Sequence, residues 1–273
     1  MKKNNIVPIL VCCLIAFVFL TLCLGSDSTD EPQIDNSSYK SSVIFETDLL
    51  RITATNINTS EKETEIKLLI ENFSPSNAVV SCSSYIVNGM MIDTVMYAEV
   101  TAKANANCSI YLDGADLRKS GIEKISQIIP YDSHVSFDSG KKYPLDYCIT
   151  INEDHTQTVN EEGKLLYSAN GITVISKFEP GSASKKIPML IKNESGMDLH
   201  IGTSYVTVNG FTVPEISYYT PICNGTYRYF EIELSPFEKE NQDIGNFETA
   251  SFCLSFMKPK STQIIFQTEQ LHA

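Results

Sequence analysis

The chain has 273 residues, of which 42% are apolar and 20% are charged, and its formal net charge is −12 at pH 7. These proportions are typical of folded protein, and the length leaves room for two domains of about 100 residues behind a targeting segment. Nucleic-acid binding depends on clustered Lys and Arg, and this chain nowhere has more than two adjacent basic residues. Composition and charge therefore exclude nucleic acid as a partner.

An apolar run from Ile6 to Leu24 follows Lys2 and Lys3. Lysines at this place keep the N-terminus inside, so everything after Gly25 is expected to be exported. We favour a retained helical membrane anchor within residues 1–25, because a run of this length spans a hydrocarbon core of about 30 Å. Two alternatives stay open: cleavage after Gly25, and lipidation of Cys23. All three place the remaining chain outside the cytoplasmic membrane.

Residues 26–42 are rich in Ser, Asp and Asn and contain few apolar side chains, which predicts a flexible stalk. Residues 152–163 have the same character and are predicted to be a linker. These two segments delimit a first domain over residues 43–151 and a second over residues 164–273.

Short runs of β-branched and aromatic residues recur about every ten residues, separated by Asn, Ser, Gly and Pro, which predicts strands. The strands expected in the first domain are Val43–Phe45, Leu50–Asn56, Glu63–Glu71, Ala78–Val87, Val95–Val100, Asn107–Leu112, Ile128–Phe137 and Tyr143–Ile151. The second domain has a similar pattern from Lys164 to Leu271. Single helical turns are expected at Gly114–Ser120, capped by Asp113, and at Pro236–Asn241. The predicted fold is mainly β, with two antiparallel sheets packed face to face in each domain.

The stretch from Ile66 to Tyr97 reappears without a gap as Ile187 to Tyr218. The matching residues are Asn72, Ser74, Ser83, Val87, Asn88, Gly89 and Tyr97 in the first copy and Asn193, Ser195, Ser204, Val208, Asn209, Gly210 and Tyr218 in the second. The two Asn-Gly pairs predict type I′ hairpin turns, in which both central residues have positive φ. Before each turn the apolar alternation changes phase, which predicts a β-bulge or strand break at Ser83 and Ser204. We interpret the two domains as copies of one ancestral domain.

Several of these segments resemble tandem immunoglobulin-like domains of unknown function on membrane-anchored or lipoprotein-type surface proteins of Gram-positive bacteria. The segments are Leu49–Thr55, Leu68–Asn72, Val87–Gly89, Asp116-Leu117 and Gly121-Ile122. The resemblance covers both copies and implies two tandem immunoglobulin-like β-sandwiches at the cell envelope, with no established catalysis. The second copy departs from the pattern, because Val213-Pro214 replaces Ile92-Asp93 and Phe237 stands near the place of Leu117.

Five cysteines follow the apolar segment, an odd number, and none in one copy matches one in the other. Cys82, Cys148 and Cys253 lie within predicted apolar strands, where free thiols behave as small buried hydrophobes. A Cys223–Cys253 bridge is the best candidate for a disulfide. The four histidines show no metal-ligand spacing, so neither a metal nor a cofactor is expected.

No complete catalytic motif is present. Ser182 and Lys185 satisfy the Ser-x-x-Lys pattern of penicillin-interacting enzymes, but its two companion motifs are missing. Aromatic residues offer a different lead: Tyr218, Tyr227 and Tyr229 form a candidate binding patch. Packing in the core and at its rim is the other interpretation of these tyrosines, and we favour it over a binding patch.

These observations together predict a non-catalytic cell-surface module, not an enzyme, that binds an unknown protein or glycan or serves as a spacer. Its membrane contact is expected through the N-terminus alone, and cleavage would release it as a secreted protein. Two alternatives remain, namely an accessory lipoprotein of a transport or secretion system and an enzyme with an unrecognised site.

Overall fold

Strands dominate the part of the chain that the computed structural model describes, which comprises residues 39–152, 158–181, 186–213, 219–233 and 246–273. The predicted mainly β class is confirmed for these residues. The expected N-terminal helix, residues 1–25, lies outside them, as does the helical turn expected at Pro236–Asn241. Within the described ranges no helix is long and apolar enough to cross a membrane.

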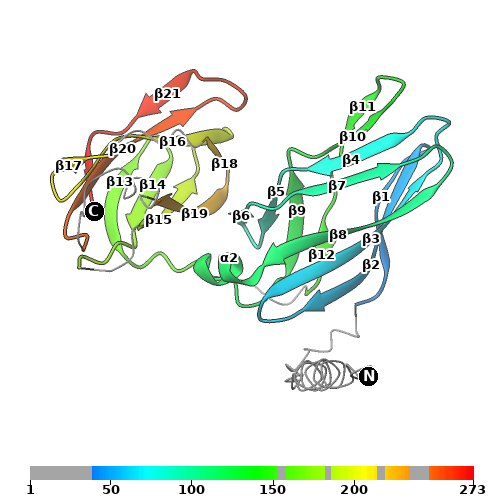
Figure 1. Ribbon diagram of the computed structural model, residues 1–273, viewed down its shortest axis with the longest axis horizontal. Coiled ribbons are helices and arrows are strands. Elements are labelled where there is room, and N and C mark those ends of the chain that lie inside the picture. The colour runs from blue at the N-terminus through cyan, green and yellow to red at the C-terminus, as the bar shows by residue number, and fades with distance from the viewer. Residues whose placement is uncertain (1–38, 153–157, 182–185, 214–218, 234–245) are drawn as a thin grey trace, which may run out of the picture. The chain divides into compact units, whose positions relative to one another are not determined.

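The first half of the chain forms two four-stranded antiparallel sheets and part of a third, larger sheet (Figure 1). The order in the first sheet is β1-β2-β3-β8 and in the second β11-β10-β4-β7. The elements of this half are β1 (Ser42–Glu46), β2 (Leu50–Thr59), β3 (Glu63–Asn72), β4 (Ala78–Cys82), β5 (Ser84–Val87), β6 (Met90–Ile92), β7 (Met96–Val100), β8 (Asn105–Asp113), α2 (Gly114–Lys119), β9 (Gln127–Tyr131), β10 (His134–Phe137), β11 (Lys142–Pro144) and β12 (Ile149–Thr150).

The second half completes the larger sheet and adds a six-stranded sheet. The larger sheet has eight strands in the order β12-β9-β5-β6-β19-β15-β14-β13. In the six-stranded sheet the order β17-β16-β20-β21 is supplemented by β18 beside β16 and β22 beside β20. The elements of this half are β13 (Lys164–Ala169), β14 (Ile172–Ser176), β15 (Lys186–Asn193), β16 (Leu199–Val208), β17 (Phe211–Thr212), β18 (Thr220–Ile222), β19 (Thr226–Glu233), β20 (Ala250–Met257), β21 (Ile264–Gln267) and β22 (Leu271–His272).

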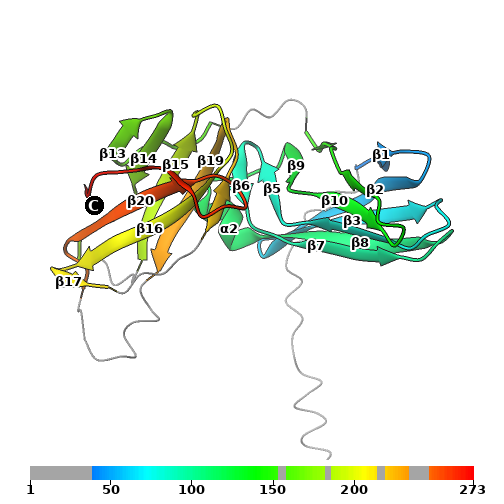
Figure 2. The ribbon, with the colours of Figure 1, turned by 90° about the horizontal axis from the view of Figure 1, so that it is seen from above.

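Each half buries its own apolar core between facing sheets. Alternate residues of β2 and β3, such as Ile52 and Ile66, belong with Val80 of β4 to the first core. In the second core, Ile191 of β15 meets Phe252 of β20 in the same way. Figure 2 shows β16 and β20 in one layer and β13 to β15 in another. This layered packing has its origin in the two-residue period of the strands, because alternate side chains lie on the same face of a sheet and that face can be buried.

Two buried asparagines make the same hydrogen bonds in the two halves. Asn72 Nδ2 donates to the carbonyl oxygens of Ser76 at 2.8 Å and Val100 at 3.1 Å. Asn193 Nδ2 donates to the carbonyl oxygens of Met197 at 2.9 Å and Ile222 at 3.1 Å. Both Oδ1 atoms accept a backbone N–H two residues further on, at 3.0 Å. These side chains satisfy main-chain groups where a strand ends, so burial of a polar residue is stabilising at both places.

The predicted Asn-Gly turns are confirmed. Asn88 and Gly89 have φ values of 50° and 83°, and Asn209 and Gly210 have values of 49° and 81°. The turn asparagines also fix the next connection, because Asn88 Oδ1 accepts backbone N–H groups of residues 126 and 127 and Asn209 Oδ1 accepts those of residues 248 and 249. One asparagine in each half therefore supports both a turn and a distant loop.

The predicted irregularities at Ser83 and Ser204 are confirmed in two different forms. In the first half β4 ends at Cys82, β5 begins at Ser84, and the two strands belong to different sheets. In the second half β16 continues, but its register against β20 shifts between Ser204 and Thr207. Tyr205 has a φ of 53° at this bulge. The extra residue changes which side chains face the core, as the change of apolar phase requires.

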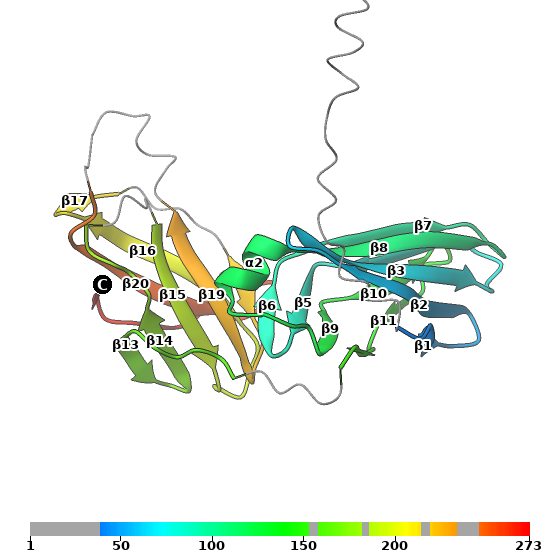
Figure 3. The same cartoon turned by 90° about the horizontal axis from the view of Figure 1, so that it is seen from below.

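The two halves share a sheet, which the sequence did not predict. β6 pairs with β19 in parallel through Met90 and Tyr227, and the Tyr227 N–H donates to the Gly89 carbonyl oxygen at 2.9 Å. Figure 3 shows β6 beside β19. Ile175 and Leu190 of the second half also join the first core. Residues 35–273 accordingly form one compact unit and not two units joined only by residues 152–163.

The short helix α2 follows β8 as expected. Asp113 Oδ1 accepts the backbone N–H groups of Ala115 at 2.7 Å and Asp116 at 3.1 Å, which confirms Asp113 as its N-cap. The Asp113 carboxylate therefore begins this helix.

Candidate functional site

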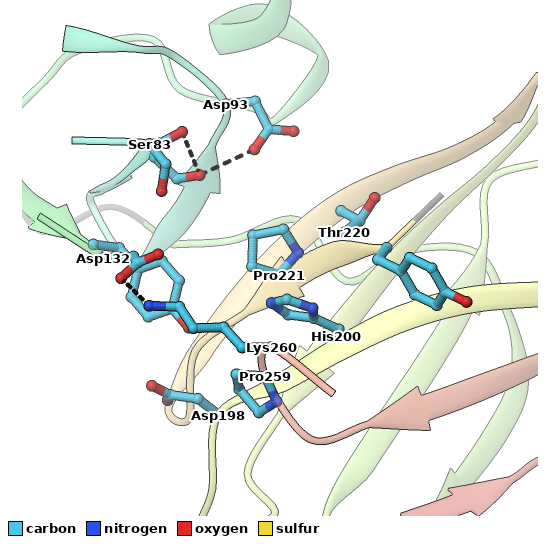
Figure 4. Close-up of a pocket in the computed structure, with 12 residues that line it drawn as sticks. Ser83, Asp93, Asp132, Asp198, His200, Thr220, Pro221, Pro259 and Lys260 are labelled. Carbon is cyan, nitrogen blue, oxygen red and sulfur yellow. Dashed lines mark hydrogen bonds and ion pairs between the residues drawn. The ribbon is translucent and has the colours of Figure 1, made fainter. Parts of the chain in front are cut away.

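A polar cleft of about 600 Å³ lies where strands of the first half meet strands of the second (Figure 4). Its lining from the first half is Ser83, Ser84, Asp93, Tyr131 and Asp132. Its lining from the second half is Asp198, His200, Tyr219, Thr220, Pro221, Pro259 and Lys260. The break between β4 and β5, the loop after β6 and the turn between β9 and β10 bring the first group to this edge. The starts of β16 and β18 and the turn after β20 bring the second.

Arg228 links the two sides of the cleft through Asp93 of the first half and Pro221 of the second. It lies in β19, is 4% exposed, and forms an ion pair with Asp93. Its Nη1 donates to the Pro221 carbonyl oxygen at 2.9 Å, so one guanidinium contacts the loop after β6 and also β18. Within the described chain its Nε has no hydrogen-bond partner. Burial lowers the pKa of Arg228, while the Asp93 carboxylate opposes that shift. The charge persists because a guanidinium is strongly basic.

A second ion pair crosses the mouth of the cleft. Lys260 Nζ lies 2.8 Å from Asp132 Oδ1. Both residues have positive φ, 58° and 48°, and both lie in turns. The Lys260 side chain is 73% exposed, so this pair contributes about 0–1 kcal/mol to stability. It balances the charge of Asp132 without closing the cleft.

Further titratable groups that line the cleft include His200, Tyr131 and Asp198. Burial lowers the pKa of His200, so its imidazole is mostly uncharged at pH 7. Burial raises the pKa of Tyr131, and the charges of Asp198 and Asp132 raise it further. Carboxylates from both halves therefore lie close to one phenol. Asp198 accepts the backbone N–H of Asn224 at 2.9 Å.

The tyrosine patch predicted from the sequence is not an exposed surface. Tyr227 and Tyr229 lie on one face of β19, and Phe230 lies on the opposite face, as expected. Both tyrosines are half-buried, however, and pack against the first core. The Tyr227 hydroxyl donates to Glu161 Oε1 at 2.5 Å, and Lys192 lies 5.3 Å from its ring centroid. Tyr218 lies outside the described residues. The binding patch is therefore wrong for Tyr227 and Tyr229, and packing at the rim of the core holds instead, because β19 lies inside the shared sheet and not at a free edge.

The predicted Cys223–Cys253 disulfide is wrong, since both thiols are free. The residue before Cys223 pairs with Leu199 at the start of β16, whereas Cys253 pairs with Ser204 further along that strand. At about 3.3 Å per residue the two cysteines are some 15–20 Å apart along β16, and a disulfide requires Cα atoms within about 7 Å. Cys223 instead packs against Met91, with its Sγ 3.3 Å from the thioether sulfur.

The expected burial of the other cysteines holds only in part. Cys82 is buried, whereas Cys148 is exposed and Cys253 is half-buried. Cys148 precedes β12 and is not part of a strand, so its side chain faces outward and accepts a hydrogen bond from Gln127 Nε2 at 3.0 Å. The lipidation candidate Cys23 lies outside the described residues, and so do Ser182 and Lys185.

The geometry of the described residues offers no metal centre. Among the residues that the structure describes, no group of three His, Cys, Asp or Glu side chains is placed to hold a metal ion. Three aspartates, Asp93, Asp132 and Asp198, line the cleft.

The chain matches no protein-family model and no curated protein. Among solved structures it is similar to the red sea bream transglutaminase, with a TM-score of 0.24 and 8% sequence identity. The match covers 77% of this chain and 29% of that chain, so it spans less than a third of the transglutaminase. A likeness this weak assigns neither a fold nor an activity to this chain. The expectation that this chain is not an enzyme is nevertheless corrected, because this neighbour is an enzyme and neither sequence comparison supports a non-enzyme classification.

Proposed function

We propose that the protein is an extracytoplasmic ligand-binding module, held at the membrane by its N-terminus, in which the polar cleft is the ligand site. In this proposal the two halves are immunoglobulin-like β-sandwiches that arose by duplication. The apolar run after Lys2 and Lys3 supports the location, since it suits export and anchoring. The matching environments of Asn72 and Asn193 support the duplication, because unrelated domains have no reason to repeat them.

One observation carries the choice of site. The cleft draws convergent polar groups from both halves, and the Arg228–Asp93 ion pair and the β6–β19 pairing join those halves directly behind it. Small-molecule sites occur preferentially where two structural units meet, and volumes of about 300–1,000 Å³ are usual. The cleft volume of about 600 Å³ falls in this range.

Binding of the full-length protein, labelled and held in detergent micelles, to isolated cell envelopes tests this proposal. Asp198→Asn and Tyr219→Ala should each reduce binding at least about tenfold, the usual effect of removing a central contact. Tyr97→Ala is the matched control, because Tyr97 is also an exposed tyrosine, at 58%, but lies on β7 and does not line the cleft.

Equal binding by the two cleft variants and the parent protein would reject the cleft as the ligand site. The proposed location is tested separately by adding protease to intact cells that produce the chain. Residues after Gly25 should be digested, and complete protection of these residues would contradict an extracytoplasmic location.

A further inference from the structure

We infer that the ligand of the cleft is a neutral, hydroxyl-rich glycan segment. This inference rests on the proposed function, because it assumes that the cleft is the ligand site. It goes beyond that proposal by naming the chemical class of the ligand.

The charges of the cleft are largely compensated inside the protein. Asp93 is paired with Arg228, and Asp132 is paired with Lys260 at 2.8 Å. His200 carries little charge at pH 7 because of its burial. A strongly anionic ligand would meet a chain of net charge −12 and the carboxylate of Asp198. A strongly cationic ligand would compete with Lys260 for Asp132. The lining therefore favours a ligand without net charge.

The lining is also rich in groups that bind hydroxyls. A carboxylate accepts about four hydrogen bonds, and Asp198 receives one from the Asn224 N–H at 2.9 Å. Ser83 and Thr220 contribute hydroxyls that both donate and accept. A sugar presents several adjacent hydroxyls that donate to carboxylates and accept from other hydroxyls. Such a ligand satisfies these polar groups when water leaves the cleft, which an apolar ligand does not.

Aromatic rings supply the remaining element of glycan recognition. Tyr219 is 51% exposed, Tyr131 is half-buried, and both line the cleft. Tyrosine offers a large, rigid apolar face with a polar tip, which matches the apolar C–H face and hydroxyl edge of a sugar ring. Pro221 and Pro259 add further apolar surface between the polar groups. Figure 4 shows Pro221, His200 and Thr220 together with Lys260 around the cleft.

The test uses the full-length protein in detergent micelles on a glycan array that carries neutral, N-acetylated and acidic glycans. Trilysine is the cationic comparison. Affinity for the strongest ligand is then measured by isothermal titration calorimetry with the parent protein and three variants. Asp198→Asn and Tyr219→Ala should each weaken binding at least about tenfold, and Tyr97→Ala should leave it unchanged. Affinity should change less than about threefold between roughly 0.05 and 0.5 M salt, because a neutral ligand is not attracted by net charge.

Each outcome has a defined meaning. Selective binding of acidic glycans or of trilysine, lost in the two cleft variants, would overturn the glycan inference and leave the cleft as the ligand site. Neutral-glycan binding that survives both substitutions would overturn the inference together with the proposed function. Binding of no glycan on the array would also overturn the inference. Unchanged thermal unfolding of the variants confirms that each is folded, which is expected because Asp198 and Tyr219 are exposed.

Discussion

At the scale of single residues, buried polar side chains organise this protein as much as its apolar ones. Asn72 and Asn193 are 1% and 0% exposed, yet each satisfies backbone groups that would otherwise lose their hydrogen bonds on burial. Removing such a side chain takes away the donor to a buried carbonyl oxygen, that of Val100 or Ile222, and the acceptor of one backbone N–H. Each unsatisfied group costs about 1–3 kcal/mol.

Asn72→Ala and Asn193→Ala should therefore each lower the free energy of unfolding by about 2–4 kcal/mol. Their effects should be similar in size, because the hydrogen bonds match. Urea unfolding followed by circular dichroism measures both effects. Asn58→Ala, at an exposed position of β2, is the control and should stay within about 0.5 kcal/mol of the parent. A large effect in one half with none in the other would contradict the equivalence of the two sites.

The ion pair of Arg228 with Asp93 gives a second prediction at this scale, because removing Asp93 and removing Arg228 should lower the stability by different amounts. Asp93→Ala leaves a buried guanidinium without its counter-charge, which should cost about 3 kcal/mol. Arg228→Met should cost less, since the Asp93 side chain is 62% exposed and can be hydrated. The double variant should resemble Arg228→Met. The same unfolding measurement decides the order, and a greater loss in Arg228→Met than in Asp93→Ala would refute the account of this pair.

At the scale of elements, features that depend on local sequence were predicted correctly, whereas the pairing of strands distant in sequence was not. The Asn-Gly turns, the Asp113 cap and the irregularities at Ser83 and Ser204 depend on neighbours in sequence, so their signals lie in short stretches. The pairing of β6 with β19 joins Met90 to Tyr227 through a single residue pair, for which no local pattern exists. Its consequence, the half-burial of Tyr227 and Tyr229, decides between the two interpretations of these tyrosines that the sequence left open.

The bulge in β16 provides a prediction for this scale. Tyr205 has a positive φ and is 65% exposed, so its conformation costs energy that its packing does not recover fully. Tyr205→Asn should raise the free energy of unfolding by about 0.5–1 kcal/mol, because Asn tolerates the left-handed region. Tyr205→Val should lower it, because a β-branched side chain resists that region. Equal stability of the two variants would show that the bulge imposes no such strain.

At the scale of the whole molecule, the candidate site is the part that the sequence did not reveal. Asp93, Asp132, Asp198 and Lys260 are scattered along the chain and meet only because the two halves share a sheet. One signal was present in the sequence: Arg228 alternates with Thr226 and Phe230, which all face inward on β19. A buried arginine requires a counter-charge, so this position pointed to a specific partner whose identity only the fold supplies.

Hydrogen–deuterium exchange on the full-length protein, with and without the strongest neutral glycan, tests the central claim most directly. We predict added protection in both halves at once, at residues 83–93 and 131–132 and at residues 198–200, 219–221 and 259–260, because these segments form one cleft. Protection confined to one half, or located away from these segments, would contradict a single ligand site built jointly by the two halves.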